Sequence, residues 1–115
     1  MVVDDEAGVR RVSCAVLRNA GYAVQEARDG MEALELIRSA EDTIDLVVLD
    51  ATMPRMSGPE LLKKTKDSPV KVILTSGYSE PVDRDLAGNV AGFLRKPFNS
   101  HDLLNAVGKA LTQMP

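Results

Sequence analysis

The chain has 115 residues, 27% of them charged, and a formal net charge of -3 at pH 7. Residues 1–115 suit a single domain with its own core and are too few for two. No apolar run approaches the length that spans a bilayer, and an acidic chain with two Phe, two Tyr and no Trp is unsuited to direct nucleic-acid binding. The single Cys14 has no second thiol to pair with, which is typical of a protein of the reducing cytoplasm.

Short apolar runs alternate with amphipathic stretches along the whole chain. In chain order the expected elements are a strand over 1–3, a helix over 9–20, a strand over 22–27, a helix over 33–40, a strand over 46–50, a helix over 60–66, a strand over 70–74, a short helix within 78–89, a strand over 91–94 and a helix over 100–111. Gly21 is placed to stop the first helix, and Asn99 or Ser100 to cap the last. This alternation implies right-handed crossovers and predicts an α/β fold with a doubly wound, five-stranded parallel sheet and helices on both faces.

The strand over 46–50 is the centre of this predicted sheet. Four consecutive apolar residues indicate burial on both faces, and Asp50 ends the run. In open parallel sheets the carboxyl ends of the strands face the crevice where ligands bind. Asp50 is therefore placed for chemistry as well as for turning the chain.

Polar groups also follow the other strands at the same edge of the sheet. In chain order the groups at this edge are Asp4 and Asp5, then Asp50, then Thr75 or Ser76, then Lys96. Carboxylates so close repel one another unless a cation joins them, and an all-oxygen ligand set favours Mg²⁺. The amine and the hydroxyl suit a tetrahedral anion. Together these groups describe a site for a phosphoryl group on Asp50.

Four stretches of the sequence resemble the signature stretches of the receiver domain of bacterial-type two-component response regulators. They are Asp4-Asp5-Glu6, Leu49-Asp50-Ala51-Thr52-Met53-Pro54 with Gly58, Thr75-Ser76-Gly77-Tyr78, and Lys96-Pro97-Phe98. The resemblance covers essentially the whole chain in the right order. It implies the flavodoxin-like, CheY-like sheet order 2-1-3-4-5, with the first strand shortened at its N-terminus.

The resemblance also implies a role for each acidic residue. Asp50 would be the phosphoacceptor. Asp4 and Asp5 would hold Mg²⁺ together with Asp50, and the backbone carbonyl of Thr52 would complete the protein ligands. The phosphoryl donor would be a phosphohistidine on a histidine kinase or a histidine phosphotransfer domain.

Ser76 and Lys96 would contact the phosphoryl group. Ser76 is preferred to Thr75 as the hydroxyl, because Gly77 then matches the small residue that leaves room for the phosphoryl group. Thr75 remains the alternative.

Phe93 would be the switch residue that moves when Ser76 is drawn toward the phosphoryl group. This movement would alter the face formed by the helix within 78–89, the strand over 91–94 and the final helix. The peptide bond between Lys96 and Pro97 is expected to be cis. The protein is expected to be a monomer or a weak, phosphorylation-dependent dimer.

Three other points concern function. The short first strand and the Ser-Gly-Tyr and Lys-Pro-Phe stretches favour a receiver from a hybrid sensor kinase. One alternative is a pseudo-receiver that serves as a binding scaffold without phosphorylation. The other is a dehalogenase-like, Mg²⁺-dependent phosphatase, but that family has a second acid two residues after its nucleophile, where this chain has Thr52.

Overall fold

The computed structural model describes residues 1–39, 44–51, 57–65, 70–77 and 90–112. Strands and helices alternate along most of this part of the chain. The elements in chain order are β1 (Val2–Val3), α1 (Ala7–Asn19), β2 (Glu26–Ala27), α2 (Gly30–Ser39), β3 (Leu46–Asp50), α3 (Gly58–Lys64), β4 (Lys71–Ser76), β5 (Val90–Arg95) and α4 (Ser100–Thr112). The helix expected within 78–89 lies outside the described residues.

The strands form one five-stranded parallel sheet in the order β2-β1-β3-β4-β5. Every residue of β3 is buried, as its run of apolar side chains predicts. The predicted fold class and strand order are therefore confirmed. Because all strands run in one direction, their carboxyl ends meet at one edge of the sheet.

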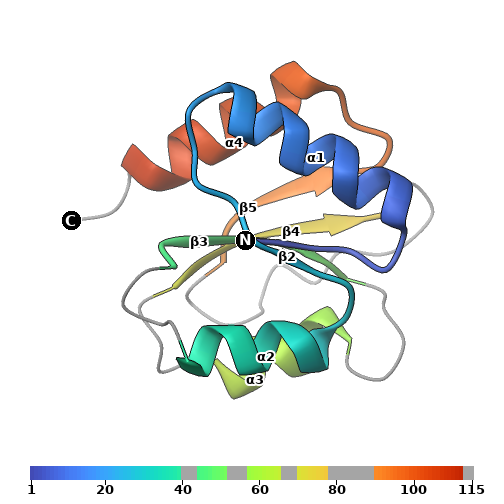
Figure 1. Ribbon diagram of the computed structural model, residues 1–115, viewed down its shortest axis with the longest axis vertical. Helices are drawn as coiled ribbons and strands as arrows, with labels where there is room; N and C mark the ends of the chain where they lie inside the picture. The colour runs from blue at the N-terminus through green and yellow to red at the C-terminus, as the bar shows by residue number, and fades with distance from the viewer. Residues whose placement is uncertain (40–43, 52–56, 66–69, 78–89, 113–115) are drawn as a thin grey trace.

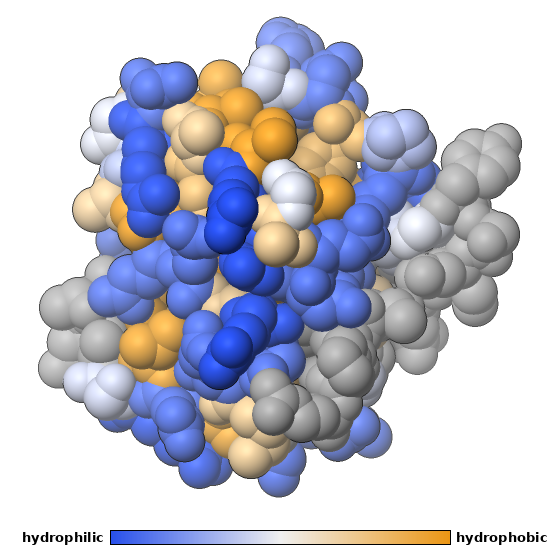
Figure 2. All heavy atoms as spheres, turned by 45° about the vertical axis from the view of Figure 1, so that its right-hand side comes forward, coloured by the Kyte–Doolittle hydropathy of each residue, from blue (hydrophilic) through white to orange (hydrophobic). Residues whose placement is uncertain are grey.

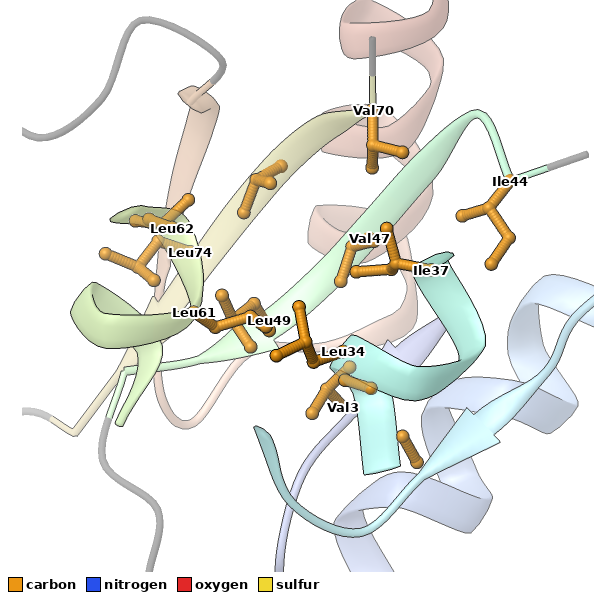
Figure 3. Close-up of a cluster of buried hydrophobic side chains, with 13 residues drawn as sticks. Val3, Leu34, Ile37, Ile44, Val47, Leu49, Leu61, Leu62, Val70 and Leu74 are labelled. Atoms are coloured by element: carbon orange, nitrogen blue, oxygen red, sulfur yellow. The ribbon is translucent and has the colours of Figure 1, made fainter. Parts of the chain in front are cut away.

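Helices cover both faces of the sheet (Figure 1). In that view α1 and α4 lie above it, and α2 and α3 lie below. Each layer has its own apolar cluster. The lower cluster includes Leu34, Ile37 and Leu49 (Figure 3), and the upper one includes Cys14, Ile73 and Leu103. The two clusters pack against opposite faces of the sheet and thereby fix the position of its carboxyl edge.

Strand β2 is shorter than the predicted strand over 22–27. Only Glu26 and Ala27 pair, because β1 offers two partners, Val2 and Val3. The other strands agree with the prediction to within two residues, and β4 continues through Ser76. An apolar pattern marks where a strand is buried, but its length depends on the neighbouring strand.

Local sequence explains where the helices begin and end. Asn99 caps α4, since its Oδ1 accepts the backbone N–H of Asp102 at 2.8 Å. Ser57 caps α3 by accepting the N–H of Glu60 at 3.3 Å. After α1 the chain turns at Gly21, whose φ of 99° is in the region that favours glycine.

Candidate functional site

Three carboxylates gather at the carboxyl edge of the sheet. Asp4 follows β1, Asp50 ends β3, and both are buried at 4% exposure, whereas Asp5 is exposed. One oxygen from each of Asp4, Asp5 and Asp50 lies within 4.8 Å of the other two. The structure thus brings the predicted acidic residues together.

Lys96 supplies the positive charge in this cluster. Its Nζ lies 2.9 Å from Asp4 Oδ2 and 3.2 Å from Asp50 Oδ2. Glu6 Oε1 is farther away, at 3.9 Å. Burial alone lowers the pKa of the Lys96 ammonium, but the hydrogen bond to Asp4 and the charges of Asp4 and Asp50 outweigh this effect and raise its pKa above the ordinary 10.5. Lys96 is therefore a stable cation between two buried carboxylates.

The backbone around Lys96 connects it to the neighbouring strand. Its N–H donates to the carbonyl of Ser76 at 2.7 Å, and its peptide bond to Pro97 is cis. On the other side of β4, the N–H of Ala51 donates to the carbonyl of Thr75 at 2.7 Å. The end of β4 therefore lies between the residues that follow β3 and β5.

Asp4 is held from several directions. Its Oδ1 accepts the N–H of Glu6 at 2.9 Å, and its own N–H donates to the carbonyl of Ala27 at 3.2 Å. Its carbonyl accepts Nη1 of Arg10 at 2.8 Å. The loop between β1 and α1 is thus fixed by contacts to β2, to α1 and within itself.

Thr75 and Ser76 are both buried, at 2% exposure. Leu74 belongs to the lower cluster and Ile73 to the upper one, so alternation places Ser76 on the lower face and Thr75 on the upper face. Phe93 packs against the lower cluster and is paired with Leu74. Ser76 and Phe93 consequently share a face of the sheet.

Gly58, at the start of α3, packs directly on the backbone that follows β3. A Cβ at this position would lie 2.9 Å from both Ala51 Cα and the carbonyl oxygen of Asp50. The N–H of Gly58 donates to the carbonyl of Ala51 at 3.1 Å. Only a residue without a side chain permits this approach. Thr52, the predicted carbonyl ligand, lies outside the described residues.

A groove of about 580 Å³ opens beside Lys96, between α1 and the segment that leads into α4. Its walls include Val9, Val12, Phe98 and Leu103, and we call it the α1–α4 groove. Val12, on this wall, is 65% exposed. Figure 2 shows hydrophobic surface in the upper half of the molecule, where the α1–α4 layer lies.

The donor set fits Mg²⁺. The cation takes oxygen ligands at about 2.0–2.1 Å, so opposite ligands stand roughly 4 Å apart. Carboxylate oxygens within 4.8 Å of one another need only small adjustments to meet this requirement. Asp4, Asp5 and Asp50 would hold the ion, with the remaining positions left for the predicted Thr52 carbonyl, water or phosphoryl oxygen.

Two features of this site have no signal in the sequence. The contact of Arg10 with the Asp4 carbonyl depends on how α1 is rotated on the sheet, and its partner Glu26 lies 16 positions away. The α1–α4 groove is formed by segments from opposite ends of the chain. The apolar spacing of α1 indicates a helix but not which of its residues are buried, since Ser13 is buried and Val12 is exposed.

The family model of the response regulator receiver domain matches residues 1–108. The sensor kinase CckA of Brucella abortus is 38% identical over 96% of this chain, which spans 12% of that protein. The sporulation initiation phosphotransferase F of Bacillus subtilis is 34% identical over 96% of this chain and 91% of its own length. The receiver domain of the hybrid histidine kinase CckA, solved by crystallography, covers 96% of this chain and 95% of its own with a TM-score of 0.83 and 38% identity.

The fold and the match over nearly the whole sequence define a signalling domain of the CheY-like class. The chain belongs to the response regulator receiver domain family, and it is a receiver domain of two-component phosphorelay signalling. It spans 46% of a third curated relative, the response regulator MprA of Mycolicibacterium vanbaalenii. Among the described residues, no helix is both long and apolar enough to cross a membrane.

Proposed function

We propose that the domain accepts a phosphoryl group on Asp50 from a phosphohistidine and thereby changes its affinity for a partner or an attached domain. The observation that carries this proposal is the meeting of a buried Asp50 with Lys96 and two further carboxylates at one edge of the sheet. The proposed compartment is the cytoplasm, where free Cys14 stays reduced.

The transfer exchanges one bond for another. A carboxylate oxygen of Asp50 attacks phosphorus, a new O–P bond forms, and the N–P bond to the donor histidine breaks with the electron pair leaving on the imidazole nitrogen. Such transfers depend mainly on positioning and on stabilisation of the charge that spreads over the phosphoryl oxygens. Mg²⁺, when bound by Asp4, Asp5 and Asp50, supplies positive charge for those oxygens.

Lys96 supplies the second positive charge. Its Nζ already lies 3.2 Å from Asp50 Oδ2, so a phosphoryl group on this carboxylate stands within reach of the ammonium. The hydroxyl of Ser76 is proposed as a hydrogen-bond donor to the same group, with Thr75 as the alternative.

The proposed signal passes from Ser76 to Phe93. Both residues belong to the face that packs on the lower cluster, which supports a coupled movement. When Ser76 turns toward the phosphoryl group, Phe93 gains space beside it. The outer surface that includes β5 and α4 then shifts between two packings.

The donor is proposed to dock in the α1–α4 groove. The groove shares Lys96 and Glu6 with the acidic site, so a protein seated there is next to Asp50. Exposed Val12 offers an apolar contact for a helix that carries the donor histidine. Histidine kinases and histidine phosphotransfer domains are the partner classes that this chemistry requires.

Intact mass spectrometry tests the phosphorylation directly. The protein is incubated with acetyl phosphate, with and without MgCl₂, and the mass is recorded. We expect one phosphoryl adduct that depends on Mg²⁺ and is absent in Asp50→Asn. Asp45→Asn is the matched control, since Asp45 precedes the opposite end of β3 and is exposed. A folded wild-type protein without an adduct would contradict the proposal and favour a scaffold role.

A further inference from the structure

Arg10 contacts the acidic site through the backbone and not through a carboxylate of the cluster. Its Nη1 donates to the carbonyl oxygen of Asp4 at 2.8 Å, and its Nε donates to Glu26 Oε1 at 3.2 Å. The Arg10 side chain is 15% exposed. One largely buried guanidinium therefore joins α1, the loop after β1 and strand β2.

The carbonyl that Arg10 holds belongs to the peptide group that precedes Asp5. Because a peptide group is planar, fixing the oxygen of Asp4 also orients the N–Cα bond from which Asp5 begins. Asp5 is exposed, and within the described residues its carboxylate has no hydrogen bond or ion pair. The position of that carboxylate is thus set by its backbone more than by contacts of its own.

Asp4 differs from Asp5 in this respect. Its carboxylate is held by Lys96 Nζ at 2.9 Å and by the N–H of Glu6 at 2.9 Å. Loss of the Arg10 contact leaves both of these interactions in place. The consequence of that loss is therefore expected at Asp5.

We infer that Arg10 is a positioning residue for metal binding, which fixes the peptide before Asp5 so that its carboxylate stands beside those of Asp4 and Asp50. This inference rests on the proposed function, since the position of Asp5 matters only if the acidic cluster binds Mg²⁺. Glu26 holds the guanidinium in its orientation and is itself held by Arg18, whose Nη1 lies 3.7 Å from Glu26 Oε2. The planar guanidinium group of arginine suits this task because it presents hydrogen-bond donors in fixed directions.

Calorimetric titration with MgCl₂ tests the inference on the metal-free protein. Arg10→Gln removes both contacts and is expected to raise the Kd for Mg²⁺ by about tenfold, the scale of losing a residue that supports a metal ligand. Glu26→Gln leaves the contact with Asp4 and is expected to give a smaller loss. Arg11→Gln changes an exposed arginine on the same helix and should leave the Kd within about twofold.

A loss of stability alone must be separated from a loss of positioning. Ile37→Val weakens the lower cluster, away from the loop between β1 and α1. It should therefore lower the urea midpoint and leave the Kd for Mg²⁺ unchanged. If Arg10→Gln does not fold, Arg10→Met, which keeps the apolar stem, replaces it with the same expectation. If the wild type binds Mg²⁺ and the Arg10 variants bind it equally tightly, the role of Arg10 is disproved and the proposed metal site is not. No Mg²⁺ binding by wild type would overturn the proposed metal site as well.

Discussion

Lys96 Nζ lies 3.2 Å from Asp50 Oδ2, although the two residues are 46 positions apart in the chain. The same ammonium is closer still to Asp4, at 2.9 Å. Both carboxylates are buried, and a buried charge is costly without a partner. In the absence of a metal ion, Lys96 therefore supplies positive charge that stabilises the acidic cluster.

The first prediction concerns removal of this charge. Lys96→Met leaves the buried carboxylates of Asp4 and Asp50 without their cation and should lower the free energy of unfolding by about 1–3 kcal/mol without Mg²⁺. Urea unfolding with EDTA measures this loss. Lys109→Met, on the exposed side of α4, should have almost no effect.

Mg²⁺ should restore much of the stability that Lys96→Met loses, because in the proposed metal site both cations would neutralise the same carboxylates. A ligand at ten times its Kd stabilises the folded state by about 1.4 kcal/mol. We expect the variant to gain at least as much stability from Mg²⁺ as the wild type gains at the same concentration. A smaller gain would show that Lys96 assists the metal instead of substituting for it.

The fold was accessible from the sequence because its signals are local. The first four residues of β3, Leu46 to Leu49, form one buried apolar run. The periodic spacing over α1 indicates a helix but not its buried side, since Val12 is 65% exposed and Ser13 is buried. Parallel topology then places Asp4, Asp50 and Lys96 at one edge, which is why their meeting was predictable. The length of β2 was not, since it depends on how many residues of β1 pair with it.

Finer features of the site could not be predicted from the sequence, because they depend on how loops and helices are oriented relative to one another. That Lys96 is nearer to Asp4 than to Asp50 follows from how the loops after β1 and β5 approach each other. The contact between Arg10 and the Asp4 carbonyl depends on the rotation of α1. Periodicity assigns a residue to a face of a helix, but not to an atom across the sheet.

Gly58 provides the second prediction. The Cβ of Gly58→Ala would meet backbone atoms of Asp50 and Ala51 at 2.9 Å, and backbone yields less readily than the end of a side chain. We expect a loss of about 1–3 kcal/mol in unfolding free energy and slower phosphorylation by acetyl phosphate, because the backbone after β3 must shift. Both are measured on the same samples.

Gly108→Ala is the matched control for this substitution. Gly108 lies in α4, and its Cβ would have no heavy atom within 4 Å. Alanine in a helix is better than glycine by about 0.5–1 kcal/mol, so this variant should be more stable than wild type. If both glycine variants gained stability, the close approach at Gly58 would be disproved.

The third prediction separates donor docking from the chemistry on Asp50. Val12→Glu places a charge in the α1–α4 groove at a site that is 65% exposed, so the fold should tolerate it. We expect a loss of at least about 1.4 kcal/mol in docking free energy, so phosphotransfer from a phosphohistidine protein should fall at least tenfold. Phosphorylation by acetyl phosphate, which needs no docking surface, should stay unchanged.

Ala15→Glu is the control, since Ala15 is exposed on the same helix and is not part of the groove wall. It adds the same charge at a comparable distance along α1. If phosphotransfer fell equally in Val12→Glu and Ala15→Glu, the cause would be the added negative charge and not a contact in the groove. Loss of acetyl phosphate reactivity in Val12→Glu would show that the substitution disturbs the acidic site itself.

The fourth prediction concerns Cys14, whose side chain is fully buried in the upper cluster. Burial raises the pKa of its thiol above the ordinary 9.0, and the charge of Glu26 adds to this effect. Because the folded state holds the proton more tightly, the contribution of the thiol to stability is complete below the unfolded pKa near 9 and is lost as the pH rises through the folded pKa. Unfolding in urea at several values between pH 7 and pH 11 should therefore show that the stability gap between wild type and Cys14→Ala narrows above pH 9. A gap that stays constant over this range would mean that the thiol ionises as easily in the folded protein as in the unfolded chain.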